Sequence, residues 1–215
     1  QLFAPVAKRV LNLWKRYSQP CPLGTFLSDE MKNIANTDIA FHSTGMTMFH
    51  LKNDESGVIT NYDLMRTISA ETPIVKFEIN TSQLKQTLQH SVLKRMYINN
   101  GNSRFLQCSR NIKITGEENY KEKTYKIVQI AINDENLLDD NGNPLDDERK
   151  FVCAADEFIA NGGQGYDILK EIPKEKVLLN GEELRINDLL RLSLINIQDT
   201  FTPETEYLPF VLYDI

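Results

Sequence analysis

The amino-acid sequence predicts an α+β fold, in which helices pack on a mixed, largely antiparallel sheet. In residues 74–79, Val75, Phe77 and Ile79 alternate with Ile74, Lys76 and Glu78, as in a strand with one face in water. The apolar run at residues 151–155 predicts a second strand. A helix is predicted at residues 84–96, where apolar residues recur every four positions after a capping cluster at residues 80–82. Strand and helix signals therefore alternate along one chain, which is typical of this fold class.

The length and composition fit one sizeable soluble domain. The chain has 215 residues, of which 41% are hydrophobic and 25% charged, as in ordinary globular proteins. Its net charge of -6 argues against non-specific binding to nucleic acid. No apolar run approaches the roughly 20 residues that a membrane-spanning helix needs, and the first residues lack a secretory pattern. The compartment stays open, because a trimmed secreted chain would also lack its signal.

The first predicted element is an amphipathic helix over residues 5–17. Its apolar residues share helical spacing and are Val6, Val10, Leu13, Trp14 and Tyr17. A proline in the first turn fits a helix start. We therefore divide the chain into an N-terminal linker or packing helix at residues 1–19 and a main domain at residues 20–215, with a C-terminal extension from about residue 173.

The remaining elements follow in chain order. Further helices are expected at residues 23–35, at about 61–65 after a cap at Thr60 or Asn61, and at 184–197. Further strands are expected at residues 38–41, 57–60, 105–108, 111–115 and 125–133, with a loop at 42–47. We expect the strands at 74–79, 105–108, 125–133 and 150–156 to share one sheet that the 84–96 helix covers. Residues 203–215 are expected to be a tail packed on the surface.

Metal chemistry is not expected from this chain. Its three histidines, His42, His50 and His90, form no cluster with the spacing of metal ligands. The acidic run at residues 134–148 lacks the glycine and glutamate positions of a calcium loop, so we interpret it as a hairpin turn near residues 141–142. The cysteines Cys21, Cys108 and Cys153 are expected to be buried free thiols, with a Cys21–Cys108 bridge as the alternative.

A glycine-rich loop at residues 161–165 is the most informative stretch. Three glycines in four positions follow the 151–155 strand and need positive φ or a close approach to another group. Phe158 and Tyr166 flank this loop, so two aromatic faces beside exposed backbone amides would suit a flat polar ligand such as a nucleobase. The alternative is a glycine-rich turn between two core aromatics.

This stretch and several others resemble the C-terminal domain of the 5'-nucleotidase family, the metal-dependent nucleotide phosphohydrolases that include UDP-sugar hydrolases. The other stretches occur in the right order and lie at residues 24–31, 38–41, 57–64, 84–92, 101–107 and 142–146. The resemblance spans roughly residues 22–169 and implies a 5'-nucleotidase C-terminal domain-like fold.

The resemblance also implies a division of labour between two domains. In the family a separate N-terminal metallophosphoesterase domain holds the divalent metal, which is zinc, manganese or magnesium, and the C-terminal domain recognises the nucleotide. Six residues of this chain match or adjoin the family's substrate-binding positions: Phe158, Asn161, Gly162, Gly163, Gln164 and Tyr166. Gln164 stands where the family usually has aspartate.

Other substrate-binding positions of the family are degenerate here. Gln19 and Thr47 align with phosphate-binding arginines, and Ala70 aligns with the second stacking aromatic. His42 begins the segment that corresponds to the family's asparagine and glycine stretch. A bidentate arginine contributes roughly 1.5 to 3 kcal/mol per charge-assisted bond to a phosphate, so these changes predict weak nucleotide binding.

Two functions remain open from the sequence. The chain could be the nucleotide-recognition domain of a 5'-nucleotidase-like phosphohydrolase, which acts with a catalytic domain in cis or trans and is not catalytic alone. Alternatively, it could be a non-catalytic binding or protein-interaction module derived from that domain. The resemblance suggests a secreted, periplasmic or vacuolar setting.

Overall fold

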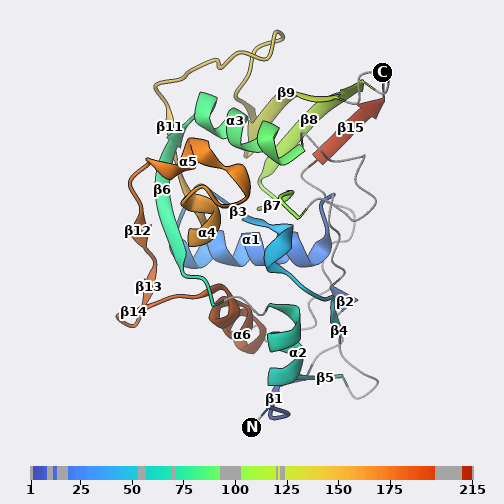
Figure 1. Ribbon diagram of the computed structural model, residues 1–215, viewed down its shortest axis with the longest axis vertical. Coiled ribbons are helices and arrows are strands. Elements are labelled where there is room, and N and C mark those ends of the chain that lie inside the picture. Colours follow the sequence, from blue (N-terminus) through green and yellow to red (C-terminus); the bar gives the residue numbers. More distant parts are fainter. Residues whose placement is uncertain are drawn as a thin grey trace.

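A computed structural model of the chain describes residues 2–8, 12–13, 19–52, 57–68, 71–92, 103–119, 121, 124–196 and 210–214. Figure 1 shows helices arranged around two sheets. The α-helices are α1 (Pro22–Ala35), α2 (Asn61–Thr67), α3 (Thr81–Val92), α4 (Glu157–Ala160), α5 (Asp167–Lys170) and α6 (Ile186–Asn196). Two 3-10 helices, η1 (Thr44–Met46) and η2 (Gly163–Gly165), lie in the connections.

The larger sheet has five strands in the order β12-β6-β11-β3-β7. Its strands are β12 (Glu175–Lys176), β6 (Ile74–Asn80), β11 (Lys150–Asp156), β3 (Ile39–Ser43) and β7 (Leu106–Cys108). Only the β11–β3 pair is parallel, with Ala155 opposite Phe41. The other pairs are antiparallel, so the predicted mixed, largely antiparallel sheet is confirmed.

A second sheet has the order β10-β9-β8-β15. Its strands are β10 (Glu135–Asn136), β9 (Thr124–Ile132), β8 (Ile112–Asn119) and β15 (Phe210–Asp214), and β15 runs parallel to β8. The small pairs are β1 (Pro5–Lys8) with β5 (Val58–Thr60), β2 (Asn12–Leu13) with β4 (Leu51–Lys52), and β13 (Leu178–Leu179) with β14 (Glu182–Glu183). The described part of the predicted surface tail is thus an edge strand.

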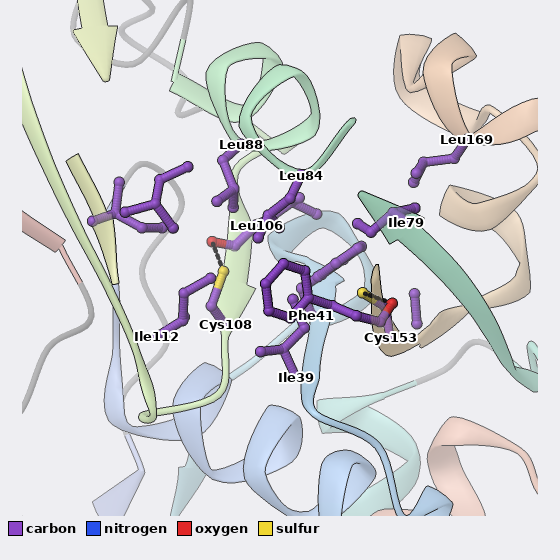
Figure 2. Packing of buried hydrophobic residues seen from close by; sticks show 14 of the residues in the cluster. Ile39, Phe41, Ile79, Leu84, Leu88, Leu106, Cys108, Ile112, Cys153 and Leu169 are labelled. Atoms are coloured by element: carbon purple, nitrogen blue, oxygen red, sulfur yellow. Dashed lines mark hydrogen bonds between the residues drawn. The ribbon is translucent and has the colours of Figure 1, made fainter. Parts of the chain in front are cut away.

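The large sheet separates two hydrophobic clusters. On one face, α1 and α6 pack together and bury Leu27, Met31 and Leu190. On the other face, α3 joins the large sheet to the second sheet, because Leu84 and Leu88 belong to the same cluster as residues of both (Figure 2). The prediction that this helix covers the sheet is confirmed for its described part.

One predicted sheet partner is wrong. The strand at residues 124–132 pairs with β8 and β10 in the second sheet, and not with β6, β7 or β11. It follows β8 after a short connection and pairs with it along its whole length, whereas β11 pairs with strands far away in the sequence. Alternation predicts that a strand exists, but not which strand lies beside it.

The predicted N-terminal helix at residues 5–17 is also wrong where the structure describes it. Residues 5–8 are β1, antiparallel to β5, and residues 12–13 are β2, antiparallel to β4. Leu13 is fully buried in the same cluster as the apolar residues of α1. Pairing with distant strands overrides the helical spacing of the apolar residues. The division at residue 19 remains a proposal.

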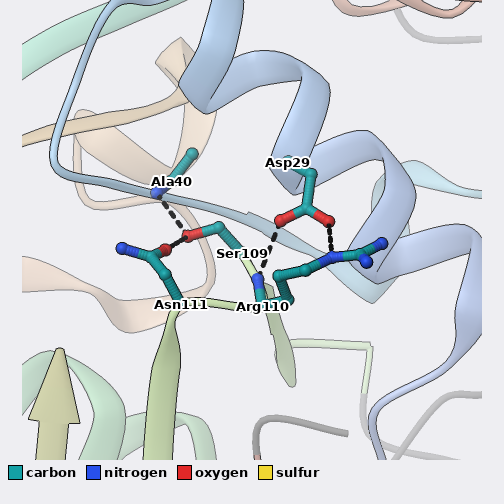
Figure 3. A network of polar contacts seen from close by, with 5 residues as sticks. All are labelled: Asp29, Ala40, Ser109, Arg110 and Asn111. Atoms are coloured by element: carbon teal, nitrogen blue, oxygen red, sulfur yellow. Dashed lines mark hydrogen bonds and ion pairs between the residues drawn. The ribbon is translucent and has the colours of Figure 1, made fainter. Parts of the chain in front are cut away.

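A polar network fastens the turn between β7 and β8 to α1 and β3 (Figure 3). The Asp29 carboxylate accepts hydrogen bonds from the Arg110 backbone amide at 2.8 Å and from its Nε at 2.6 Å. The Ser109 hydroxyl accepts the Ala40 amide and donates to Asn111. These contacts fix the position of α1 against the two sheets.

The cysteines and the remaining helices agree with expectation. All three cysteines are buried and free, so the Cys21–Cys108 bridge is absent. The helices at residues 22–35, 61–67 and 186–196 correspond to the predicted ones, and Thr60 forms the expected cap of α2. None of the helices in the described residues has the length and apolar character needed to span a bilayer.

Candidate functional site

The glycine-rich loop is fixed at its start by a buried carboxylate. Asp156 is the last residue of β11 and caps α4, since its Oδ1 accepts a hydrogen bond from the Ile159 backbone amide at 3.0 Å. The backbone then turns through positive φ at Gly162, Gln164 and Gly165. Glycine adopts this conformation without strain, which explains two of the three glycines.

The third glycine, Gly163, makes room for Phe158. A Cβ atom at Gly163 would lie 2.5 Å from the Phe158 carbonyl oxygen and 2.8 Å from its ring. Phe158 nonetheless stays 46% exposed, so it offers a flat apolar surface beside the loop. Asn161 is also exposed, directly after α4.

Tyr166 lies in the core. Its ring is fully buried, its hydroxyl donates to the Arg104 carbonyl oxygen, and burial raises its pKa. The His90 ring stacks edge-on against it at 4.6 Å between centroids. Of the two flanking aromatics, therefore, only Phe158 offers a face to a ligand in this structure, and Tyr166 anchors the loop.

His90 supports the loop from α3. Its Nε2 lies 3.1 Å from the Gln164 carbonyl oxygen, and its ring lies close to Gly165. The sequence pattern puts this histidine off the apolar stripe of its helix, at the surface or a boundary. The structure explains that position, because α3 packs against α5 and the end of the loop.

Gln164 brings a second chain segment to the loop. Its side-chain amide lies over Gly45 of η1, where an added Cβ would be 2.8 Å from Nε2. Its Oε1 is buried and has no hydrogen-bond partner in the described part of the chain. The loop therefore lies against the segment after β3, although Gln164 and Gly45 are far apart in the sequence.

The degenerate positions also lie near this segment. Thr47 is buried directly after η1, while His42 lies within β3 and not in the predicted loop. The backbone carbonyl of Gln19 accepts a bond from the Gln107 side chain at 3.0 Å. Ala70 lies outside the described residues.

Gln107 is the residue that sequence reasoning missed. Its side-chain oxygen accepts a hydrogen bond from the Cys21 backbone amide at 3.0 Å. Its side-chain NH2 group donates to the Gln19 carbonyl oxygen at 3.0 Å and to the Thr44 hydroxyl at 3.1 Å. It thereby connects the start of α1 to η1. A single glutamine in a strand carries no periodic signal, so only the structure identifies it.

Two buried titratable groups lie side by side at this end of the sheet. Ala155 is opposite Phe41 in the parallel β11–β3 pair, so the next residues along, Asp156 and His42, are neighbours. Burial raises the pKa of Asp156 to about 6, although backbone amides oppose this. Burial lowers the pKa of His42 to about 4. At neutral pH, Asp156 is therefore charged and His42 is neutral.

The hydrogen bonds of His42 define its tautomer. The Ser28 hydroxyl donates its only hydrogen to the Gln107 carbonyl oxygen at 2.9 Å. It must therefore accept from His42 Nδ1, 3.2 Å away, which leaves Nε2 without a proton. This Nε2 and Asp156 Oδ2 are both buried and have no hydrogen-bond partner in the described residues.

The described residues offer no metal centre. No group of three histidine, cysteine, aspartate or glutamate side chains among them could hold a metal ion. The buried His42 and Asp156 are only two such groups. What the site combines is an exposed ring, a loop with positive φ and neutral amide side chains, which suits a flat polar ligand.

Comparison with known proteins identifies relatives of this fold. Residues 3–171 match the family described as 5'-nucleotidase, C-terminal domain. The 5'-nucleotidase precursor of Thermus thermophilus superposes on 97% of this chain with a TM-score of 0.72 and 18% identity. The NAD nucleotidase NadN of Haemophilus influenzae superposes on 99% with a TM-score of 0.71 and 13% identity.

A third structure broadens the group. The sulfate thiohydrolase SoxB of Thermus thermophilus, solved with glycerol, superposes on 98% of this chain with a TM-score of 0.64 and 16% identity. No curated protein matches the chain in sequence. The chain spans 39%, 39% and 35% of the lengths of these three neighbours, so the likeness concerns the fold of one part of each.

Proposed function

The chain belongs to the 5'-nucleotidase C-terminal domain family, and on that premise we propose that it is the nucleotide-recognition domain of a metal-dependent phosphohydrolase. The catalytic metallophosphoesterase domain, with its divalent metal, would lie outside this chain. The nucleotide would contact this chain at the site around the glycine-rich loop. One observation carries the proposal: Phe158 is exposed above Gly163, beside backbone that favours glycine.

The parts of this site divide into a stacking surface and polar groups. Phe158 would stack on the base, since every nucleobase has a flat π face. Asn161 and Gln164 would hydrogen-bond the base or ribose through their amides. Gly162 would let the backbone approach the ligand, Gly163 leaves room for the Phe158 ring beside it, and Tyr166 holds the loop in place from the core.

We expect the chain to bind nucleosides weakly and with little regard to phosphate. Stacking on one ring provides roughly 1 to 3 kcal/mol, which corresponds to a dissociation constant of about millimolar or weaker. The neutral side chains of Thr47 and Gln19 offer no cation to a phosphate. Adenosine and AMP should therefore bind about equally, and salt should matter little.

An NMR titration with both ligands tests this expectation. Phe158→Ala should abolish the shifts of the loop resonances, whereas Phe3→Ala, which truncates another exposed phenylalanine, should not. Micromolar binding of AMP that collapses in high salt would contradict the prediction and indicate that another cation holds the phosphate.

The chain alone is expected to release no phosphate from AMP, whether or not zinc, manganese or magnesium is added. A two-metal hydrolase needs a cluster of ligands to activate water, and the described residues offer none. A phosphate assay on metal-purged and then reconstituted protein measures this. Metal-dependent release by a verified pure sample would show that the chain carries its own catalytic centre.

A second candidate is a non-catalytic binding or interaction module derived from this domain. The neutral residues at Gln19 and Thr47, together with the buried ring of Tyr166, favour it, because they weaken any nucleotide site. The coding sequence upstream of this chain separates the two candidates. Metal-ligand motifs there would support the first function, and their absence would support the second.

A further inference from the structure

Exposed apolar side chains gather at the end of the molecule opposite the second sheet. Six of the ten large hydrophobic residues that are exposed in the described chain lie around α2: Leu2, Phe3, Met48, Phe49, Tyr62 and Met65. Together with Arg66 we call them the α2 face. Figure 1 places α2 beside β1 and β5, at the end where the N-terminus lies.

The α2 face is continuous. The rings of Phe3 and Tyr62 contact each other at 5.7 Å between centroids, and the Arg66 guanidinium lies 5.4 Å from Phe49 and 5.9 Å from Tyr62. The Met48 amide donates to the Thr67 carbonyl of α2 at 2.7 Å. Beside Leu2 and Met65 the surface is hollowed by about 470 Å³, between α2 and α6.

Arg66 has no acidic partner among the residues that the structure describes. Its Nε is shielded from water and makes no hydrogen bond within that part of the chain. The only acidic side chain on α2, Asp63, is already engaged, because its carboxylate accepts the amide and the hydroxyl of Thr60 in the helix cap. Two rings hold the guanidinium in place, and no described carboxylate compensates its charge.

This combination is that of a protein interface. Aromatic residues, methionine and arginine are enriched where proteins bind each other, and a patch of this kind is seldom left bare on a monomer. An arginine that two rings already hold in place loses little further conformational freedom when it binds. A carboxylate that reaches it therefore forms a strong pair. The partner should therefore present an acidic side chain among apolar ones.

We infer that the α2 face is the docking surface for the domain that precedes this one in proteins of the family, an inference that rests on the proposed function. The family is by name a C-terminal domain, and Leu2 and Phe3, which lie shortly before β1, belong to the face. The neighbours devote more than half of their length to other parts. That domain would supply a carboxylate for Arg66.

Methionine oxidation by hydrogen peroxide tests this inference, because exposed thioethers react and buried ones do not. The chain alone is compared with the same chain joined to the sequence that precedes it in its natural reading frame. Met48 and Met65 should react at least about five-fold more slowly in the longer protein. Met31, which is fully buried, should stay protected in both and reports that the fold is intact.

Variants of the longer protein sharpen the test. Arg66→Glu and Phe49→Ser should restore fast oxidation of Met65, whereas Leu178→Ser, at an exposed position outside the face, should not. If the longer protein hydrolyses nucleotides but Met48 and Met65 react as fast as in the chain alone, the docking inference fails and the proposed function stands. If the reading frame holds no metallophosphoesterase domain, the proposed function fails and the inference with it.

Discussion

Replacing Asp156 by asparagine is expected to make the chain lose roughly 2 kcal/mol of stability, relative to the wild type, as the pH falls from 6.5 to 4. The native pKa of Asp156 is raised from 3.8 to about 6, so the native state binds this proton more tightly than the unfolded state. Its contribution to stability therefore rises as the pH falls through this range. Asparagine removes that contribution but keeps the oxygen that caps α4.

His42 acts in the opposite direction over the same range. Its native pKa is lowered from 6.5 to about 4, so the unfolded state binds this proton more tightly. Stability that depends on neutral His42 is present above pH 6.5 and is lost as the pH falls towards 4. In the wild type the opposite pH dependences of Asp156 and His42 therefore cancel. Together these two side chains leave the free energy of unfolding nearly independent of pH in this range.

Urea unfolding at a series of pH values measures both effects. The Asp156→Asn variant should show the His42 slope alone. His42→Asn should show the Asp156 slope alone, with stability rising by roughly 2 kcal/mol as the pH falls from 6 to 4. Subtracting the wild-type curve cancels the surface carboxylates that all three proteins share. If both variants followed the wild-type slope, these side chains would not have the environment that the structure gives them.

The sequence predicted elements whose pattern is local and strong. The apolar stripe of α3 predicts where that helix starts, and the alternation in β6 predicts nearly the whole strand. Both patterns are clear because one face of each element is buried along its whole length. The N-terminal strands were mistaken for a helix because their partners, β4 and β5, lie about 40 to 55 residues away in the sequence. Partner choice depends on three-dimensional packing that a single sequence does not display.

The candidate site was predictable to the same degree. Glycines at 162 and 165 leave a signal because positive φ restricts the residue type, and Phe158 follows the strand at a recognisable offset. Whether an aromatic faces solvent or the core cannot be read from its position, and Tyr166 turns inward because His90 and Arg104 offer it contacts from other parts of the chain. Gln107 has no pattern at all, although three segments depend on it.

The dependence on Gln107 makes Gly24→Ala a strongly destabilising substitution. A Cβ atom at Gly24 would lie 2.3 to 2.5 Å from the Gln107 side chain. That side chain cannot turn aside without breaking its bonds to Cys21, Gln19 and Thr44. Replacing glycine by alanine at a helix position without close neighbours would stabilise the protein by up to about 1 kcal/mol. The sign of the change in stability therefore shows whether the new methyl group clashes with Gln107.

Overpacking with the loss of buried hydrogen bonds should lower the free energy of unfolding by roughly 3 kcal/mol or more. Gln107→Ala should cost about 2 to 4 kcal/mol, because the Cys21 amide loses its acceptor inside the protein. The matched truncation Gln86→Ala, at an exposed position of α3, should change stability by less than about 0.5 kcal/mol.

The double variant gives the decisive measurement. Once Gln107 is truncated, the methyl group introduced at position 24 has space, so its added cost should nearly vanish. The two substitutions should therefore couple by roughly 3 kcal/mol, nearly the whole cost of Gly24→Ala alone, which urea unfolding of the four proteins in a double-mutant cycle would measure. Additive effects would mean that the methyl group clashes with something other than Gln107. A crystal structure of the double variant would then be expected to show the start of α1 displaced from β7.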